Sequence, residues 1–428
     1  MKKISWISVA SLVFMLGIYC ISSLIRSGVP GSVFDLLQKD FQTSAGVISA
    51  LGLCFTVVYA TDMLLVGPFT DKYGGMRVLL AGASILLAGS ALFVFSRNVP
   101  LLILSRILVG LGGGFIYLSV VKEITRIFPA KYFAVVMGLV YLMTYTGSIL
   151  STSPLVHLSE RWSWRSAFGG IALLLALLLA GFFLCFCRTE RPAVRPEPIR
   201  LGTYLMVFRN RASLKIYYCL ACNMAIFFFV QGVIGKKFME DVTGCTSLEA
   251  ANVILVCSVI VLVEMCLIGT VSYWIGNRRK PFILLSAVFQ TLSSCILIAG
   301  ILLHAPLWIY ALGFCIMASG YGFSGIFTAT VKEYNPEEHT SLVVGIGNFL
   351  GNFMIALFAL AAGLLLDIFR GEAILRAGTV HYPPRAYLLL WSFILCLVLP
   401  MLYLCFRIRE TYGRNISESS EAASGSGN

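Results

Sequence analysis

Long apolar stretches alternate with short polar ones along almost the whole chain of 428 residues. A helix needs about 20 mostly apolar residues to cross a hydrocarbon core about 30 Å thick. The pattern predicts twelve such helices, at 5–33, 45–68, 78–96, 99–121, 133–155, 166–187, 214–235, 250–275, 281–303, 306–330, 342–366 and 386–407. A membrane β-barrel would show shorter segments of alternating polarity. The chain is therefore interpreted as an all-α polytopic membrane protein with twelve transmembrane helices, and we expect the first helix to bend or leave the membrane after Pro30.

The composition supports a lipid environment, since 58% of the residues are hydrophobic and only 12% are charged. A soluble protein carries about a quarter charged residues. The net charge of +12 does not indicate nucleic-acid binding, because its placement follows membrane topology. Basic residues gather at the N-terminus, in the connections that follow even-numbered segments and after the last segment. The positive-inside rule then predicts that both termini are cytoplasmic.

A charged, glycine-bearing turn separates the second and third segments at Gly67–Arg77. It contains the spacing Gly67-x-x-x-Asp71-x-x-Gly74, followed by Arg77. Glycine permits close backbone approach or a positive φ. Because its charged side chains would be costly in hydrocarbon, we expect the turn to face water at the membrane surface.

The same pattern recurs in the second part of the chain as Gly269-x-x-x-Tyr273-x-x-Gly276, without the acid. Val121-Lys122-Glu123 likewise recurs as Val331-Lys332-Glu333. Matches in the same order indicate two pseudo-symmetric six-helix bundles. The predicted division is an N-terminal bundle at 1–188, a cytoplasmic linker at 189–213, a C-terminal bundle at 214–408 and a disordered cytoplasmic tail at 409–428.

These patterns resemble the major facilitator superfamily of transporters. The turn at Gly67–Arg77 is similar to the loop between the second and third helices of that family, and Arg106-x-x-x-Gly110 is similar to its fourth-helix pattern. The stretch from Pro154-Leu155 to Trp164-Arg165 resembles the run between helices five and six. The resemblance implies alternating access around a mid-membrane site lined by helices one, four, seven and ten. It also implies a gating role for Gly67, Asp71, Gly74 and Arg77.

Two arginines inside the apolar segments are candidate solute ligands, because an intramembrane charge is costly and commonly functional. Arg26 ends a polar stripe that includes Tyr19 and Ser22, and Arg106 matches the family's fourth-helix arginine. A guanidinium offers forked donors that suit a carboxylate or phosphate. The alternatives are that Arg26 reaches the outer interface and that Arg106 bonds backbone carbonyls near the first helix.

Three further residues are candidate solute contacts by position, namely Asn223 and Gln231 on the seventh segment and Tyr321 on the tenth. Hydrogen bonds between helices are an equally good interpretation of each.

Asp62 and Glu264 occupy equivalent positions in the two repeats, five residues before Gly67 and Gly269 respectively. Buried carboxylates bind and release protons near neutral pH, so they are candidates for proton coupling. Sodium is the alternative ion, and hydrogen bonding between the halves is the structural alternative.

The resulting hypothesis is a secondary-active transporter that takes up a small organic anion with protons, similar to bacterial symporters of this superfamily. The alternatives are an exporter of drugs or amphipathic metabolites and a transporter-like solute sensor. The fifth segment lacks the Gly-Pro dipeptide usual in proton-driven drug antiporters, which argues against export. We expect a monomer in a bacterial inner membrane, with no enzymatic activity, no cofactor and no metal site.

Overall fold

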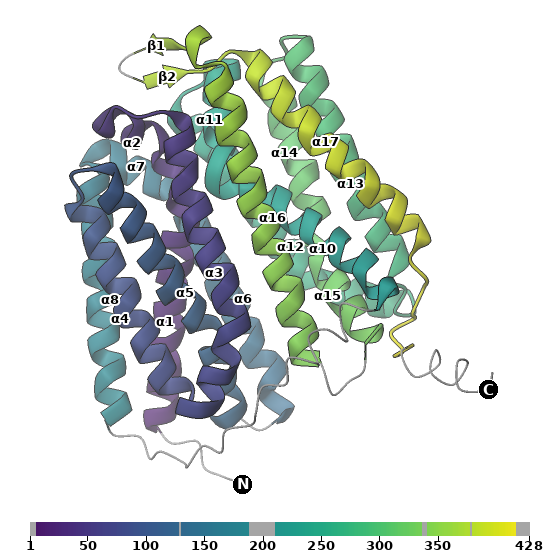
Figure 1. The fold of residues 1–428 in the computed structure, drawn as a ribbon. Coiled ribbons are helices and arrows are strands. Elements are labelled where there is room, and N and C mark those ends of the chain that lie inside the picture. Colours follow the sequence, from purple (N-terminus) through teal and green to yellow (C-terminus); the bar gives the residue numbers. More distant parts are fainter. Residues whose placement is uncertain (1–5, 128–129, 188–209, 336–339, 377–378, 417–428) are drawn as a thin grey trace.

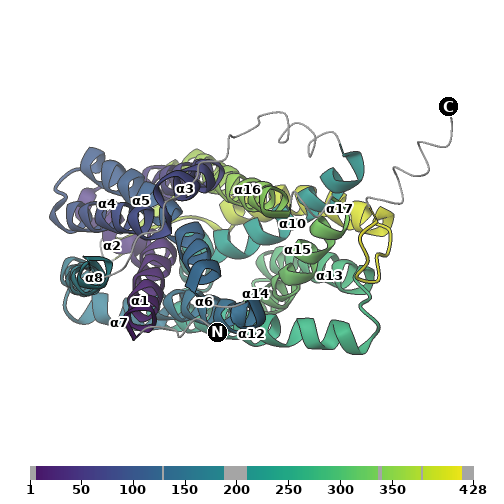
Figure 2. The ribbon, with the colours of Figure 1, turned by 90° about the horizontal axis from the view of Figure 1, so that it is seen from below.

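The computed structural model describes residues 6–127, 130–187, 210–335, 340–376 and 379–416. Two groups of long helices stand side by side, the N-half and the C-half (Figures 1 and 2). We call the end that carries α2, α7, α11 and the β-hairpin the upper end. The lower end is the opposite one, where α1 begins and α17 ends (Figure 1).

The N-half contains α1 (Trp6–Gly28), η1 (Gly31–Val33), α2 (Phe34–Phe41), α3 (Ala45–Tyr73), α4 (Gly75–Phe95), α5 (Val99–Ile127), α6 (Ala130–Leu150), α7 (Ser153–Arg161) and α8 (Trp164–Cys187). The predicted bend after the first helix is present, because α1 ends at Gly28 and α2 is a separate short helix at the upper end. The second apolar segment is longer than predicted, since α3 continues through the charged motif to Tyr73. Gly74 alone connects α3 to α4 with a φ of +82°, a conformation that glycine adopts without strain.

The C-half contains α10 (Arg211–Phe229), η2 (Val230–Ile234), α11 (Gly235–Thr243), α12 (Ser247–Trp274), α13 (Lys280–Leu302), α14 (Leu307–Gly322), α15 (Ser324–Glu333), α16 (Thr340–Ile368), η4 (Arg370–Glu372), β1 (Ile374–Arg376), β2 (Thr379–His381) and α17 (Pro384–Arg407). The π-helical turn η2 joins α10 to α11 in one continuous helical segment. The two strands form an antiparallel hairpin in which Ile374 pairs with His381. The helical pattern of the sequence did not predict this hairpin.

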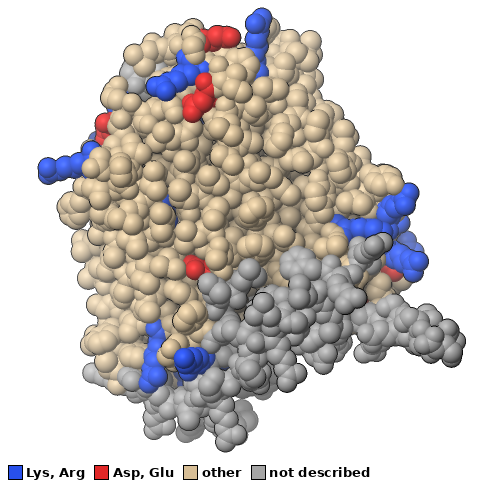
Figure 3. Space-filling view, in the orientation of Figure 1, with Lys and Arg blue, Asp and Glu red and all other residues tan. Residues whose placement is uncertain are grey.

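In the described part of the chain, eleven helices are long and apolar enough to cross a membrane. The helix α6, with 21 residues, takes the place of the fifth predicted segment. Figure 3 shows charged side chains mostly towards the two ends, with a broad and largely uncharged belt between them. The prediction of an all-α membrane fold with two six-helix bundles is confirmed, with the hairpin as a small addition.

The apolar core is divided differently at the two ends. One large buried cluster joins both halves near the upper end and includes Leu37 of α2 with Phe238 of α11. Towards the lower end each half has its own cluster, around Ile124 in the N-half and around Val331 in the C-half. The halves are thus packed into one core above and into separate cores below.

The predicted linker at 189–213 lies mostly outside the described residues, as does 417–428 of the predicted tail. Residues 409–416 correct the prediction that disorder begins at 409. Glu410 accepts hydrogen bonds from the backbone N–H groups of Arg279 and Lys280, at 2.7 and 3.0 Å. The backbone N–H of Ile416 bonds to the carbonyl of Glu333 at 2.8 Å. The backbone N–H groups at the start of α13 and the carboxylate of Glu410 attract each other, and this interaction holds the segment against the C-half.

Candidate functional site

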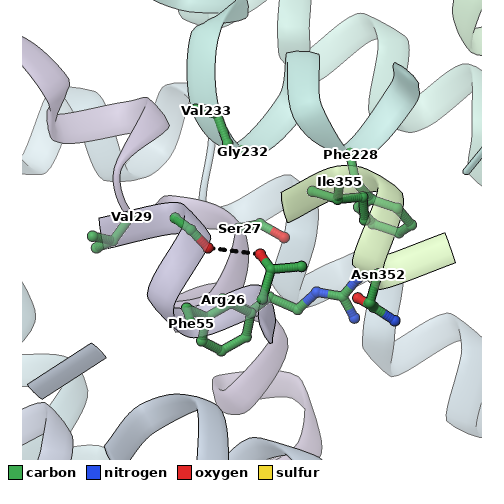
Figure 4. A pocket seen from close by; sticks show the side chains of 11 residues that line it. Arg26, Ser27, Val29, Phe55, Phe228, Gly232, Val233, Asn352 and Ile355 are labelled. Atoms are coloured by element: carbon green, nitrogen blue, oxygen red, sulfur yellow. Dashed lines mark hydrogen bonds between the residues drawn. The ribbon is translucent and has the colours of Figure 1, made fainter. Parts of the chain in front are cut away.

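A small pocket of about 30 Å³ lies between the halves around Arg26 of α1 (Figure 4). Its wall comes from α1 and α3 of the N-half and from α10, η2 and α16 of the C-half. The guanidinium of Arg26 extends towards Phe228 and Asn352, whereas Phe55 lies on the N-half side. The dashed line in Figure 4 marks the hydrogen bond that Thr56 Oγ1 donates to the carbonyl of Gly52 at 2.7 Å.

Two aromatic rings from opposite halves contact the Arg26 guanidinium. Its Cζ lies 4.9 Å from the ring centroid of Tyr59 on α3 and 4.6 Å from that of Phe228 on α10. Both distances are within the range of a cation–π interaction. Phe228 in turn meets the ring of Tyr321 edge-on at 5.4 Å, and Tyr321 stacks on Phe227 at 4.5 Å. Arg26 is therefore the centre of an aromatic row that crosses from one half to the other.

Arg26 forms no ion pair with any fully described acidic side chain. Its side chain is half-buried at the pocket wall. A partly desolvated cation without a counter-charge is electrostatically costly. The pocket has room for little more than a water molecule in this conformation, so an anion would supply the missing charge only after the halves move apart.

Arg106 lies elsewhere and does not line this pocket. It is fully buried, and its Nη2 and Nη1 donate to the backbone carbonyls of Val29 and Ile25 at 3.0 and 3.4 Å. Its Cζ also lies 4.7 Å from the ring centroid of Phe55. Arg106 thus connects α5 to the end of α1, which corresponds to the alternative that the sequence left open for it.

The other predicted solute contacts are divided between the pocket region and the interior of the helix bundles. Tyr19 stacks on Tyr117 at 5.8 Å, and Ser22 is buried on the same helix as Arg26. Asn223 is fully buried and accepts hydrogen bonds from Gln290 and Ser286 on α13, at 2.8 and 3.1 Å. Gln231 donates to Ser258 on α12 at 2.7 Å. Of the candidates, Arg26 and Tyr321 are brought together through Phe228, whereas Asn223 and Gln231 bond to neighbouring helices.

Asp62 and Glu264 have equivalent surroundings in the two halves. A Cβ added to Gly114 of α5 would lie 2.5 Å from the Cβ of Asp62. A Cβ added to Gly322 of α14 would lie 1.9 Å from Oε2 of Glu264. One buried oxygen of each carboxylate, Oδ2 and Oε2 respectively, has no hydrogen-bond partner among the described residues. Each acid therefore packs closely on a glycine of the fourth helix of its own half.

The predicted gating motif lies at the lower end, where α3 meets α4. Arg77 is exposed, and the side chain of Asp71 lies outside the described residues. The start of α4 is held by Glu123, which accepts a hydrogen bond from the Met76 backbone N–H at 3.0 Å. Its repeat partner Glu333 bonds Arg279 at 2.9 Å beside the equivalent turn of the C-half. The repeated Val-Lys-Glu therefore has a structural basis, because each glutamate supports the turn of its own half.

Charged residues join the two halves at the upper end. Lys237 of α11 lies 2.6 Å from Asp35 of α2 and 2.9 Å from Asp241 of its own helix. Lys236 is paired with Asp35 and Glu240 at 3.4 and 3.0 Å. These two lysines directly follow the predicted seventh segment, 214–235, but the structure has them buried within the helical segment. Their partner Asp35 is about 200 residues away in the chain, so the sequence offered no signal for the pairing.

Tyr59 and Phe228 are the two contacts of Arg26 that sequence reasoning missed. Aromatic residues are frequent in apolar spans, with 30 Phe and 18 Tyr in this chain. A residue type this common cannot single out two positions. Their helical spacing relative to Asp62 and Gln231 was the available signal, since each lies three residues before one of them.

The sequence profile described as the Major Facilitator Superfamily matches residues 15–359. The chain belongs to the Major Facilitator Superfamily. Its relatives are transporters rather than enzymes, which agrees with the prediction. Membership also explains the two related halves, because this fold is built from structural repeats.

Several curated transporters are similar to the chain. It is 24% identical to the hexuronate transporter of Bacillus subtilis over 82% of this chain and 87% of that protein. It is 23% identical to the multidrug resistance protein MdtM of Escherichia coli O157:H7, over 83% of this chain and 90% of that protein. An uncharacterized transporter of this superfamily, YfiU of Bacillus subtilis, is 25% identical over 48% of this chain and 39% of that protein. The match to multidrug resistance protein D of Escherichia coli spans 66% of that protein.

Two solved transporters share the fold. A bacterial homologue of the lysosomal transporter Spinster, in an inward-facing and unoccupied conformation, aligns over 96% of this chain and 97% of that chain with a TM-score of 0.71. An auto-inhibited peptide transporter of the POT family aligns over 93% of this chain and 97% of that chain, with a TM-score of 0.72. Their sequence identities of 15% and 13% support the fold alone.

Proposed function

We propose that this superfamily member is a secondary-active transporter that takes up a small organic anion. The observation that carries the proposal is Arg26, a half-buried cation between rings of both halves without a described acidic partner. A carboxylate or phosphate of the solute would accept its forked hydrogen bonds. Because Tyr59 and Phe228 belong to different halves, relative movement of the halves would change the surroundings of the bound anion.

The proposal is tested by uptake into proteoliposomes and by thermal shift against hexuronates, other organic acids and phosphorylated sugars. A ligand that binds only the folded protein raises its melting temperature. Arg26→Ala removes charge-assisted hydrogen bonds worth about 1.5–3 kcal/mol, so we expect binding about 10- to 100-fold weaker. The exposed Arg370→Ala is the matched control and should leave binding unchanged. Equal binding by both variants would contradict the anion site.

The remaining candidates have graded roles in this proposal. Tyr19, Ser22 and Tyr321 do not line the pocket, and we expect them to contact the solute as it enters or leaves. Arg106 holds the carbonyl end of α1 and so positions Arg26. For Asn223 and Gln231, the hydrogen bonds to α13 and α12 support positioning of α10 and η2 more directly than solute contact.

Proton coupling is proposed for Asp62 and Glu264, supported by their matched close packing on glycine. Asp62→Asn or Glu264→Gln should abolish accumulation driven by a pH gradient while counterflow exchange persists. Asp40→Asn, at the exposed upper surface, is the control. If replacing sodium with choline stops accumulation in the wild-type protein, sodium is the coupling ion instead.

The orientation proposed here places the lower end in the cytoplasm of a bacterial inner membrane, with a monomer as the working unit. The linker 189–213 between bundles 1–188 and 214–408 is then cytoplasmic. Asp71, beside Gly67 and Gly74, is proposed to pair near the start of α16 and to close the lower end during transport. Asp71→Asn should slow transport without removing binding, and protease access to the linker in inside-out vesicles tests the orientation.

Export of amphipathic compounds is the second candidate, favoured by the aromatic row around Phe228 and by the multidrug relatives. It predicts binding of cationic or neutral drugs that is insensitive to Arg26→Ala. A sensor that binds without transport predicts thermal shifts with no flux. The charge of the solutes that bind and the presence of flux separate the three functions.

A further inference from the structure

The buried charges at the upper end form one network across the halves, which we call the upper ion network. It contains Asp35 of α2 in the N-half and Lys236, Lys237, Glu240 and Asp241 of α11 in the C-half. The most exposed of these side chains is Asp35, at 13%, so the network is nearly closed to solvent. Unlike the Arg26 pocket, it contains both signs of charge, and its stability depends on how they balance.

Two carboxyl groups of the network come from opposite halves and contact each other. The carboxyl of Glu240 donates a hydrogen bond to the carboxylate of Asp35. An ionised carboxylate is only an acceptor, so this bond exists only while Glu240 is protonated. The Nζ of Lys236 lies against both groups, 3.4 Å from Oδ2 of Asp35 and 3.0 Å from Oε1 of Glu240. The shared proton therefore lies where the N-half meets the C-half.

The charges of the network agree with one bound proton. With Glu240 neutral, the two lysines face two carboxylates, those of Asp35 and Asp241, and the network as a whole is neutral. The Nζ of Lys237 uses its three donors on Asp35, Asp241 and a backbone carbonyl of β2, at 2.6, 2.9 and 2.5 Å. An ionised Glu240 would place an unmatched negative charge beside Asp35, which is costly in a buried site.

The groups around the network do not alter this balance. The Nδ1 of His381 on β2 lies 2.9 Å from Oδ1 of Asp241, and a neutral imidazole can donate this bond. The Arg376 side chain on β1 lies outside the described residues. Among the described titratable groups around Glu240, Asp35 alone belongs to the N-half. The others are Lys236, Lys237, Asp241, Cys245, Glu249 of α12, Tyr310 of α14, His381, Tyr382 and Tyr387.

We propose that Asp35 and Glu240 form a proton-binding site that exists only while the upper end is closed, so that one proton stabilises closure. The inference rests on the alternating access of the proposed function. When the halves separate, Asp35 leaves with α2, and Glu240 keeps the ammonium group of Lys236, which favours its ionised form. The proton then returns to the side from which it came. It is therefore not the proton that would cross the membrane at Asp62 and Glu264.

The direction of the pH dependence follows from this linkage. Glu240 binds the proton more tightly in the closed state, where Asp35 accepts its hydrogen bond, than in the open state. Closure is therefore favoured at low pH and weakens as the pH rises. Over the range in which only the closed state is protonated, the ratio of closed to open molecules falls about tenfold for each pH unit.

The test is hydrogen exchange of the full-length protein in nanodiscs without solute at pH 6.0 and 9.0, corrected for the intrinsic pH dependence of amide exchange. We expect peptides covering α2 to be about tenfold better protected at pH 6.0. Peptides covering α13, which carries no member of the network, should show no such difference. In Glu240→Gln the amide keeps a donor towards Asp35 and has no proton to lose, so α2 should be well protected at both pH values.

Three further variants locate the proton. Asp35→Asn removes the partner from the N-half, so protection of α2 should be low at both pH values. His381→Gln should keep the wild-type difference, because the imidazole does not supply the proton. Glu249→Gln should keep it as well. This residue is the matched control, since it is an exposed glutamate that caps α12 at the same end of the C-half.

Several outcomes would overturn the proposal. They are the absence of a pH difference in the wild-type protein, a difference that persists in Glu240→Gln or Asp35→Asn, and its loss in His381→Gln, which would assign the proton to the imidazole. If Glu240→Gln does not fold, the Asp35 and His381 variants decide. Because no solute is present, Arg26→Ala should keep the difference. A failure of the proposed anion site would therefore leave this result unchanged, and the two proposals can fail separately.

Discussion

The upper and lower ends of this protein are held together by different kinds of contact. At the upper end, ion pairs and one apolar core join the two halves, as between Asp35 and Lys237. At the lower end, the ion pairs between fully described side chains lie within a single half, as in Glu123–Arg126 and Arg279–Glu333. In this conformation, therefore, the contacts at the upper end hold the two halves together, whereas the contacts at the lower end stabilise each half separately.

The hydrogen bonds of Asp367 extend the same contrast. This residue, near the upper end of α16, accepts bonds from Ser44 Oγ and the Gly46 backbone N–H of α3, at 3.2 and 3.3 Å. The Tyr382 hydroxyl likewise accepts a bond from the Ala45 N–H at 3.1 Å. Closure at the upper end thus combines buried ion pairs with hydrogen bonds at the start of α3, two of which go to the carboxylate of Asp367.

The largest effect is expected from Asp35→Asn, which leaves two buried lysines without their shared partner. Breaking a buried ion pair on one side costs about 3–5 kcal/mol, so the upper end should open and α2 should lose exchange protection. Asp40→Asn, which removes the partly exposed pair with Arg165 inside the N-half, is the control and should cost less than about 1 kcal/mol. If α2 were equally protected from hydrogen exchange in both variants, the ion pairs of Asp35 would not be what holds the upper end closed.

The same carboxylate determines how acid affects closure. Burial alone would raise the pKa of Asp35, but the ammonium groups of Lys236 and Lys237 hold it well below its usual range. A lowered pKa in the closed state means that Asp35 contributes fully above about pH 4 and loses its contribution as the pH falls further. Exchange protection of α2 in the wild-type protein should therefore persist down to about pH 4.

A smaller and more local effect is expected at the lower end from Glu333→Gln. The carboxylate accepts two bonds from Arg279, at 2.9 and 3.1 Å, and another from the Thr411 hydroxyl. Losing its charge should cost about 1.5–3 kcal/mol in unfolding free energy. Exchange at α2 should not change, since the contact lies within the C-half. A change there would mean that the two ends are coupled through the C-half.

The smallest effect is expected from Glu410→Gln, because its side chain is only partly buried. Burial opposes its charge, but the N–H groups of Arg279 and Lys280 lower the pKa of this carboxyl below its ordinary value. Its contribution, less than about 1 kcal/mol, should be present above about pH 4 and decline as the pH falls further. Proteolysis of the segment after Arg407, compared at pH 7 and pH 4, measures it.

The long helices could be predicted because hydrocarbon imposes their length and composition. The sequence did not predict the contacts of residues whose partners are distant along the chain. In the sequence, Lys236 and Lys237 cannot be distinguished from lysines of an exposed loop, because their partner Asp35 is about 200 residues away. The segment around Glu410 is polar and small, and its order depends on amides of a helix start that no local pattern reveals.

The candidate site could likewise be predicted only in part from the sequence. A charge inside an apolar span marks Arg26 without any knowledge of its neighbours. Arg106 carries the same signal but bonds backbone carbonyls, a difference that depends on where α1 ends. Sequence spacing therefore located the charged positions, and only packing could distinguish a guanidinium that faces a pocket from one that bonds backbone carbonyls.

The π-helical turn η2 has a consequence for communication between the pocket and the upper ion network. It lies between Phe228, beside Arg26, and Lys236–Lys237, so one helical segment carries both sites. Each residue of an α-helix advances its neighbour by about 100°, and the wide turn contains one residue more than an α-helical path would use. The phase angle between the two sites is therefore set at η2. If the same sequence formed a regular α-helix through η2, the lysine pair would be turned by about 100° about the helix axis and directed away from Asp35, with the composition of either site unchanged.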